Sequence, residues 1–181
     1  MEGDWWGYPL IVPILDKQDG FWQVRLPWRP NGSTTWVKAE GLEITTTPYL
    51  IEIVVSEFKV RLYDHNQLVL EVPAGVGSAP TPTPLGDYYV TMMAPPPGAG
   101  YGEQVIALSA HSETIMDWQG SGDAITAIHG PVGSETTISA GGGAFTNGCV
   151  RLLIDDLNQF LVVPPGTPVT IIDKSADQAG G

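Results

Sequence analysis

The sequence is poor in positive charge. Its 181 residues include 8 Lys+Arg against 20 Asp+Glu, which gives a net charge of -12. Proteins that bind a phosphate backbone draw much of their affinity from Lys and Arg. This charge balance therefore argues against nucleic acid as a partner.

Cysteine and histidine are also scarce. Cys149 is the single cysteine, and the chain has three histidines. One cysteine excludes an internal disulfide, and so few Cys and His side chains do not favour a structural zinc site. We therefore expect no metal and no cofactor. The cysteine count leaves the cellular compartment open.

Long apolar runs are missing as well. Runs such as Phe160–Val163 are far too short to cross a bilayer, and Met1–Gly20 lacks a basic start followed by an apolar stretch. We expect no membrane span and no export signal within this chain.

Glycine and proline are abundant instead. The 22 Gly and 16 Pro make up about a fifth of the chain, compared with roughly 12% in average proteins. Long helices are therefore not expected. Many of these residues fall in two long loops, Gly75–Gly86 and Ala94–Gly102, and long loops in a compact domain are usually functional or mobile.

Basic and aromatic residues gather at the N-terminal end. Residues 1–47 hold four of the eight basic residues and five of the six tryptophans. Short apolar or alternating runs at Leu10–Leu15, Phe21–Leu26 and Thr35–Val37 are separated by turn residues. We expect a small antiparallel β module over residues 1–47. Because it buries little by itself, it should pack against the region that follows.

The second region, residues 48–174, continues the strand pattern. A helix is expected at Ile154–Val162, where apolar residues recur at helical spacing, and residues 175–181 should form a flexible tail. The expected fold class is mainly β, sandwich or barrel-like, with one short helix. The expected strands are Leu50–Val55, Lys59–Tyr63, Leu68–Val72, Tyr88–Met93, Val105–Leu108, Ala124–Ile128 and Pro168–Ile172, with a hairpin turn at Asp64–Gln67.

His129 is the first candidate functional residue. It follows the apolar run Ala124–Ile128 and precedes Gly130, so its imidazole should lie at the end of a strand, where side chains reach a cleft. A lone histidine after an apolar run is more often a packed or surface residue than a base. A catalytic role for His129 therefore requires a partner.

Cys149 is a candidate partner. Gly148 would let a substrate carbonyl approach, and the N–H groups of Asn147, Gly148 and Cys149 could hold an oxyanion. Arg151 is the only basic residue between Leu62 and Asp173, and its charge would favour a thiolate or pair with a substrate carboxylate.

Each of these residues also has a structural interpretation. Cys149 could be a small buried apolar side chain, and Arg151 could form a surface ion pair with Asp155 or Asp156. For chemistry, a cysteine needs a base within hydrogen-bond reach, and a glycine-rich loop can bring His129 to Cys149.

Four ordered segments resemble a known family. His129-Gly130 followed by Thr146-x-Gly148-Cys149-Val150-Arg151 is similar to the H-G and [S/T]-x-G-C-hydrophobic-R pattern of the L,D-transpeptidase catalytic domain, also called the YkuD domain. The resemblance covers about 125 residues, from Tyr49 to Asp173. Its other segments are Pro80–Tyr88, Leu108–Ala110 and Pro165–Val169.

The resemblance implies a β-rich acyltransferase of the bacterial cell wall. Its cysteine would attack the bond after the third residue of a peptidoglycan tetrapeptide stem, release D-alanine and pass the acyl group to an amine of a neighbouring stem. The partners implied are peptidoglycan stem peptides and a carbapenem-type β-lactam that forms an adduct. The implied location is outside the cytoplasmic membrane, so we expect this chain to be a mature form or fragment.

The resemblance also assigns roles to residues of this chain. In this assignment Cys149 is the nucleophile, His129 the general base, the carbonyl of Gly130 the group that orients the imidazole, the N–H groups of Asn147, Gly148 and Cys149 the oxyanion hole, and Arg151 and Thr146 substrate-binding residues. Two positions depart from the family. Many members carry His or Lys where Asn147 stands, and many carry Asn at the position of Ile154.

The N-terminal region resembles part of a bacterial SH3-like module at Pro27–Ser33 and Trp36-Val37. Two alternatives to the transpeptidase remain open from the sequence. Water could replace the amine acceptor, which would make a carboxypeptidase, or the chain could be a non-catalytic wall-binding module whose tryptophans supply affinity. Labelling of Cys149 by a carbapenem separates the enzyme from the binding module.

Overall fold

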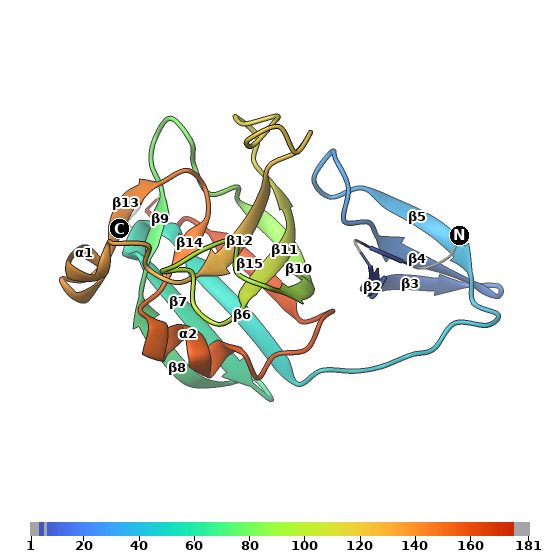
Figure 1. Cartoon of the computed structure of the whole chain (residues 1–181). Helices are drawn as coiled ribbons and strands as arrows, with labels where there is room; N and C mark the ends of the chain where they lie inside the picture. The colour runs from blue at the N-terminus through green and yellow to red at the C-terminus, as the bar shows by residue number, and fades with distance from the viewer. Residues whose placement is uncertain (1–3, 6, 176–181) are drawn as a thin grey trace.

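The chain folds into a small N-terminal part and a larger sheet-based part, as the computed structural model shows (Figure 1). The structure describes residues 4, 5 and 7–175. In Figure 1 the N-terminal part, in blue, lies to one side of the larger sheet, and an extended segment links the two. Trp6 and residues 176–181 of the expected tail lie outside the described residues.

The N-terminal part contains a three-stranded antiparallel sheet in the order β3-β4-β5. β4 and β5 correspond to expected runs, whereas β3 shares only Ile14 and Leu15 with the expected run Leu10–Leu15. Its SH3-like character stays a prediction. The bounds are β1 Asp4–Trp5, β2 Tyr8–Pro9, β3 Ile14–Gln18, β4 Phe21–Arg25 and β5 Thr34–Lys38.

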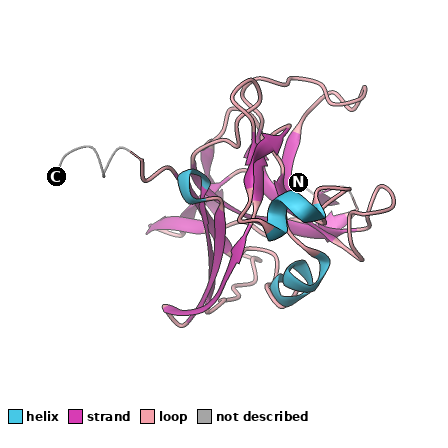
Figure 2. Ribbon diagram, turned by 90° about the vertical axis from the view of Figure 1, so that its left-hand side faces the viewer, coloured by secondary structure: helices cyan, strands magenta, loops and turns pink. Residues whose placement is uncertain are grey.

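The larger part is a curled ten-stranded sheet in the order β13-β9-β14-β12-β11-β10-β15-β6-β7-β8. Figure 2 shows how strands dominate the molecule and how short its helices are. The mainly β fold class is confirmed. The bounds are β6 Tyr49–Val54, β7 Lys59–Asp64, β8 Gln67–Pro73, β9 Gly75–Gly77, β10 Gly86–Ala94, β11 Val105–His111, β12 Ile125–His129, β13 Gly143–Thr146, β14 Val150–Arg151 and β15 Pro168–Ile172.

The expected hairpin joins β7 to β8. His65 and Asn66 occupy the turn with φ angles of 47° and 62°, and Asp64 pairs with Gln67 across it. Positive φ at both central residues is the type I′ geometry, whose twist matches that of the flanking strands. The local sequence therefore placed this turn correctly.

Besides β1 and β2, three short strands of the larger part were not expected from the sequence. β9, β13 and β14 lie in Gly-containing segments without apolar alternation, and pairing with neighbouring strands defines them. Glycine allows close packing here: a Cβ atom on Gly75 would lie 2.3 Å from the ring of Phe145, and one on Gly77 would lie 2.3 Å from the backbone N of Thr83.

The helical segments are short. α2 spans Ile154–Phe160 and begins where expected but ends two residues before Val162. A second helix, α1 at Glu135–Ser139, and a 3-10 turn, η1 at Val55–Glu57, were not expected. The single helix of the prediction was therefore wrong in number, because α1 buries one side chain, Ile138, and so leaves no periodic apolar signal.

The core lies between the curled sheet and α2. Leu157 and Phe160 of α2 are fully buried in the same cluster as Ile51, Ile106 and Val150 of the sheet. Among the described residues, no helix is long and apolar enough to cross a membrane.

Truncating Phe160 tests this packing. Phe160→Ala should lower the free energy of unfolding by about 3–5 kcal/mol, since the change leaves a cavity under α2. Val162→Ala is the matched control, because Val162 is 54% exposed and should change stability by less than about 0.5 kcal/mol. Denaturant unfolding followed by circular dichroism measures both, and equal losses would contradict this account of the core.

Candidate active site

Two neighbouring parallel strands bring the candidate residues together. β12 ends at His129, and β14 begins one residue after Cys149. The register pairs His129 with Arg151, and the N–H of Leu152 donates to the carbonyl of His129 at 2.9 Å. The three side chains therefore start from adjacent points on one edge of the sheet.

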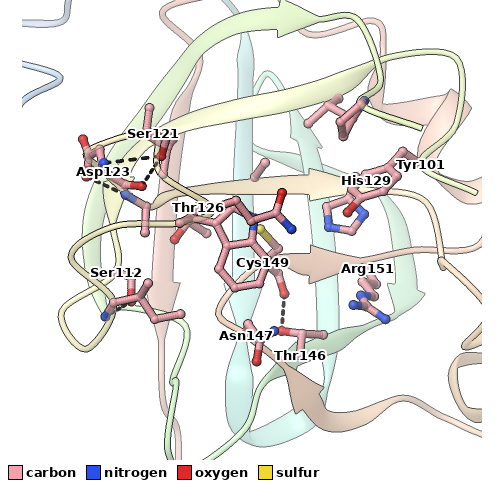
Figure 3. A pocket seen from close by; sticks show the side chains of 18 residues that line it. Tyr101, Ser112, Ser121, Asp123, Thr126, His129, Thr146, Asn147, Cys149 and Arg151 are labelled. Atoms are coloured by element: carbon pink, nitrogen blue, oxygen red, sulfur yellow. Dashed lines mark hydrogen bonds between the residues drawn. The ribbon is translucent and has the colours of Figure 1, made fainter. Parts of the chain in front are cut away.

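A pocket lies over this edge. His129, Cys149 and Arg151 line it together with Thr146 and Asn147. Figure 3 shows Cys149 in the same pocket as His129, with Thr146 and Asn147 close to it. We call residues 146–149 the nucleophile loop. Five of the residues singled out from the sequence thus share one pocket, while Gly130 and Gly148 are adjacent in sequence to its lining.

His129 is buried and held by its own backbone. Its Nδ1 lies 2.8 Å from the carbonyl oxygen of Gly130, the contact expected from the sequence. Burial lowers the pKa of His129, the hydrogen bond to Gly130 raises it in part, and the charge of Arg151 also lowers it, so that the resulting pKa is about 4. The imidazole is therefore neutral near pH 7. With Nδ1–H donating to the carbonyl, Nε2 keeps a free lone pair.

Tyr101 covers His129 and was missed by sequence reasoning. The two rings stack with centroids 4.5 Å apart and an interplanar angle of 35°. The N–H of Gly130 donates to the carbonyl of Tyr101 at 2.7 Å, and a Cβ atom on Gly130 would lie 2.4 Å from the carbonyl oxygen of Gly100. Glycine at position 130 thus permits this close approach. The sequence feature that could have indicated Tyr101 was its position in the long loop Ala94–Gly102.

Cys149 is a free cysteine of intermediate exposure. Burial of its thiol raises the pKa, while a hydrogen bond from the backbone of Ala127 and the charge of Arg151 act in the opposite direction. The charge of Arg151 thus favours the thiolate, as expected, but desolvation of the thiol outweighs this effect. The pair at rest is a neutral thiol and a neutral imidazole.

Thr146 shapes the nucleophile loop. Its hydroxyl donates to the carbonyl of Cys149 at 2.6 Å and accepts the N–H of Gly148 at 3.2 Å. Thr146 is buried and its hydroxyl bonds within the loop, although the residue also lines the pocket. Its substrate-binding role stays a prediction. The N–H of Gly148, expected in the oxyanion hole, is engaged in the same way. Within the described part of the chain, the N–H groups of Asn147 and Cys149 have no acceptor.

The proline-threonine segment Pro80–Pro84 supports this loop from outside. The hydroxyl of Thr83 donates to the carbonyl of Gly148 at 3.0 Å and accepts the N–H of Gly77 at 2.8 Å. The hydroxyl of Thr81 donates to the carbonyl of Thr146 at 3.1 Å. The segment therefore fixes the backbone that carries Cys149.

Arg151 is held beside the pocket without a carboxylate partner. Its Nη1 donates to the hydroxyl of Ser134 at 3.0 Å, and its guanidinium carbon lies 5.9 Å from the ring centroid of Phe145. Among the described residues, it forms no salt bridge with Asp155, Asp156 or any other acid. The surface ion pair considered from the sequence is absent, and the positive charge remains available at the pocket.

Metal ligation was also considered for this pocket. Among the described residues, no group of three or more His, Cys, Asp or Glu side chains could hold a metal ion.

The geometry defines a mainly β domain with a cysteine, a histidine and an arginine at one pocket. Comparison with known proteins identifies the family of this domain. The family model described as the L,D-transpeptidase catalytic domain, YkuD, matches residues 48–171. The chain belongs to this family.

A relative from Bacillus licheniformis, named as an L,D-transpeptidase YkuD, is 30% identical over 127 residues, which cover 70% of this chain and 67% of the relative. L,D-transpeptidase 3 from Mycobacterium tuberculosis has a TM-score of 0.52 at 14% identity, covering 84% of this chain and 67% of that one. LdtMt1 in complex with imipenem has a TM-score of 0.50 at 15% identity, and the match covers 86% of this chain and 69% of LdtMt1.

These structural likenesses show a shared fold. The chain spans about two thirds of the length of the Bacillus relative and of these two transpeptidases.

The protonation state of His129 can be measured directly. Because its pKa is lowered to about 4, the ring should stay neutral from pH 8 to pH 5 and take up a proton only near pH 4. Nuclear magnetic resonance of the labelled imidazole follows this titration. A midpoint near the ordinary value of about 6.5 would contradict the burial of His129.

Proposed function

We propose that this domain is a peptidoglycan L,D-transpeptidase that works through an acyl-enzyme on Cys149. The observation that carries the proposal is that one pocket holds a neutral His129, at the end of β12, and Cys149, directly before the neighbouring parallel strand β14. The resemblance carried by the His129-Gly130 and Gly148-Cys149 motifs suggests the same two residues. The site of action proposed is outside the cytoplasmic membrane, where peptidoglycan lies.

The first half-reaction begins from the neutral pair. As Sγ of Cys149 attacks the carbonyl carbon after the third stem residue, Nε2 of His129 takes the thiol proton. The C–N bond then breaks, and the imidazolium returns that proton to the departing amine of D-alanine. A thioester on Cys149 and free D-alanine result.

The second half-reaction consumes the thioester. An amine of a neighbouring stem attacks the carbonyl carbon, and His129 accepts a proton from that amine. The C–S bond breaks, an amide cross-link forms, and the proton returns to the sulfur of Cys149. If water takes the place of the amine, the same thioester yields a trimmed stem, so the products separate the transpeptidase from a carboxypeptidase.

The carbonyl of Gly130 orients the base in this mechanism. It accepts the Nδ1–H group, which leaves Nε2 free to accept the thiol proton, and the ring of Tyr101 beside the imidazole restricts its rotation. As the imidazole gains charge in the transition state, this hydrogen bond strengthens. Gly130 thus acts through its backbone alone.

The oxyanion is assigned to the N–H groups of Asn147 and Cys149. The N–H of Gly148 instead holds the loop through Thr146, and the positive φ of Gly148, 107°, gives the backbone its sharp turn. Thr146 and Thr83 keep the donors in place. Preorganised donors of this kind cost no rearrangement during the reaction.

Arg151 is assigned to the acidic substrate. The domain must admit a stem peptide that ends in a carboxylate, although its own charge is strongly negative. A guanidinium without a carboxylate partner of its own can pair with that group. Its charge also opposes proton uptake by the resting His129.

A carbapenem is the proposed inhibitory partner. LdtMt1, which shares the fold, has been observed in complex with imipenem. A strained β-lactam carbonyl presents the same electrophile as the donor stem, so Cys149 should open the ring and retain the acyl group.

Removal of the nucleophile and of the base tests the mechanism. Cys149→Ala should abolish both turnover of stem tetrapeptide and the imipenem adduct, and His129→Ala should slow acylation by roughly 10²-fold or more. Intact-protein mass spectrometry over time measures the thioester. His65→Ala is the control, since His65 is exposed in the β7–β8 turn. Turnover retained without Cys149 would refute the assignment.

The role of Arg151 makes a separate prediction. Arg151→Ala should slow acylation by at least about tenfold, and Arg151→Lys should restore only part because the guanidinium fork is lost. Ser134→Ala removes the hydrogen-bond partner of Arg151 but keeps the charge, so it should have a smaller effect. Steady-state kinetics with stem tetrapeptide decides this, and wild-type rates in Arg151→Ala would remove the residue from the site.

A further inference from the structure

Hydrogen bonds join the N-terminal module to the larger domain around Arg25 and around Arg29. At the first, the guanidinium of Arg25 donates to the carbonyl of Asp87 at 2.5 Å, and the hydroxyl of Tyr89 donates to the carbonyl of Arg25 at 3.3 Å. Asp87 and Tyr89 belong to β10, an inner strand of the sheet. This contact attaches the module to a rigid element.

The second contact is made on a wall of the pocket. The segment between β11 and β12, residues 112–124, is here termed the cleft loop. Arg29, in the β4–β5 loop, donates to the carbonyl of Ser112 at 2.7 Å, to the carbonyl of Ile115 at 3.0 Å and to Oδ1 of Asp123 at 2.8 Å. One side chain of the module thus holds both ends of the cleft loop.

The same module loop also secures the point where the cleft loop leaves the sheet. Asn31 donates to the carbonyl of His111 at 2.8 Å and accepts its N–H at 2.9 Å. The imidazole of His111 is buried, with Nε2 at 3.0 Å from the carbonyl oxygen of Pro27 and Nδ1 at 2.8 Å from Oδ2 of Asp123. Contacts of the module therefore hold the end of β11 at His111, and His111 in turn holds Asp123 at the other end of the cleft loop.

The cleft loop has no helix or strand of its own and forms one side of the pocket. Ile115 and Trp118 bring apolar side chains to the lining. Figure 3 shows Ser112 and Asp123 of this loop on the side of the pocket opposite Arg151. Whatever fixes the loop also fixes the width of the pocket in front of Cys149.

Arginine is suited to this task. Its planar guanidinium offers several donors in a fixed arrangement, which a lysine cannot reproduce. Asp123 completes the contact as a carboxylate: burial raises its pKa, but hydrogen bonds from Arg29, His111 and the backbone of Ala124 lower it by more. The contact of Arg29 with the cleft loop therefore consists of a partly buried ion pair with Asp123 and hydrogen bonds to two main-chain carbonyls.

We propose that Arg29 is a positioning residue for the acyl donor: by holding the cleft loop, it makes the N-terminal module a structural part of the substrate-binding pocket. The proposal rests on the transpeptidase function for its kinetic consequence. Arg29 acts through the loop and makes no contact with the reacting atoms. Loss of Arg29 should therefore weaken donor binding more than it slows the chemistry of Cys149.

Kinetics of the full chain tests the proposal. Arg29→Ala should raise KM for the stem tetrapeptide at least about fivefold with a smaller change in kcat, and Arg29→Lys should recover part of the loss. Alkylation of Cys149 by iodoacetamide, a small probe that needs no shaped pocket, should change by less than about twofold.

Arg25→Ala is the matched control. It removes an arginine of the same module that also donates to a backbone carbonyl, but at β10 and away from the cleft loop. It should leave KM within about twofold of the wild-type value. Equal effects of Arg25→Ala and Arg29→Ala, an unchanged KM in Arg29→Ala, or a parallel loss of alkylation would each overturn the proposal.

Amide hydrogen exchange of the full chain decides the proposal independently of activity. The N–H groups of Ser112 and Trp118 donate within the cleft loop, to Ala124 and Asp123. Residues 112–124 should exchange faster in Arg29→Ala but not in Arg25→Ala, and this result would stand even if the wild-type chain turned over no stem peptide. Identical exchange in the two variants would overturn the proposal.

Discussion

The parallel pairing of β12 with β14 is the constraint on which the site depends. It places the end of one strand beside the start of another, so that His129 lies next to Arg151 and close to Cys149. The two strands are held deep in the sheet by buried residues such as Ile128 and Val150. A shift of one residue in this register would send the functional side chains to the opposite face.

Burial at this edge sets the charge state of the proposed catalytic pair. It lowers the pKa of His129 and raises that of Cys149, so both side chains are neutral at rest. A neutral pair suits a mechanism in which the proton moves during the attack, because no ion pair must be desolvated beforehand. Among the described residues Arg151 forms no salt bridge, so no carboxylate of the protein neutralises its charge at the pocket.

The nucleophile loop is ordered by contacts from distant parts of the chain. Thr146 closes it from within, and Thr81 and Thr83 hold it from the Pro80–Pro84 segment. The opposite wall of the pocket is held in a comparable way by the N-terminal module through Arg29. Polar side chains that donate to backbone carbonyls thus supply the rigidity that short strands and loops lack.

Local sequence determined the elements whose signal is local. Alternating β-branched residues predicted most long strands, the Asp64–Gln67 turn needed only its own backbone preferences, and the Gly148-Cys149 motif with His129 pointed to the pocket. Tertiary structure decided the rest. The short strands exist only through their neighbours, Tyr101 reaches His129 across a loop, and the hydroxyl of Thr146 turns inward to the backbone. The low pKa of His129 and the hold of Arg29 on the cleft loop follow from burial and from contacts between segments far apart in the chain, which no local pattern encodes.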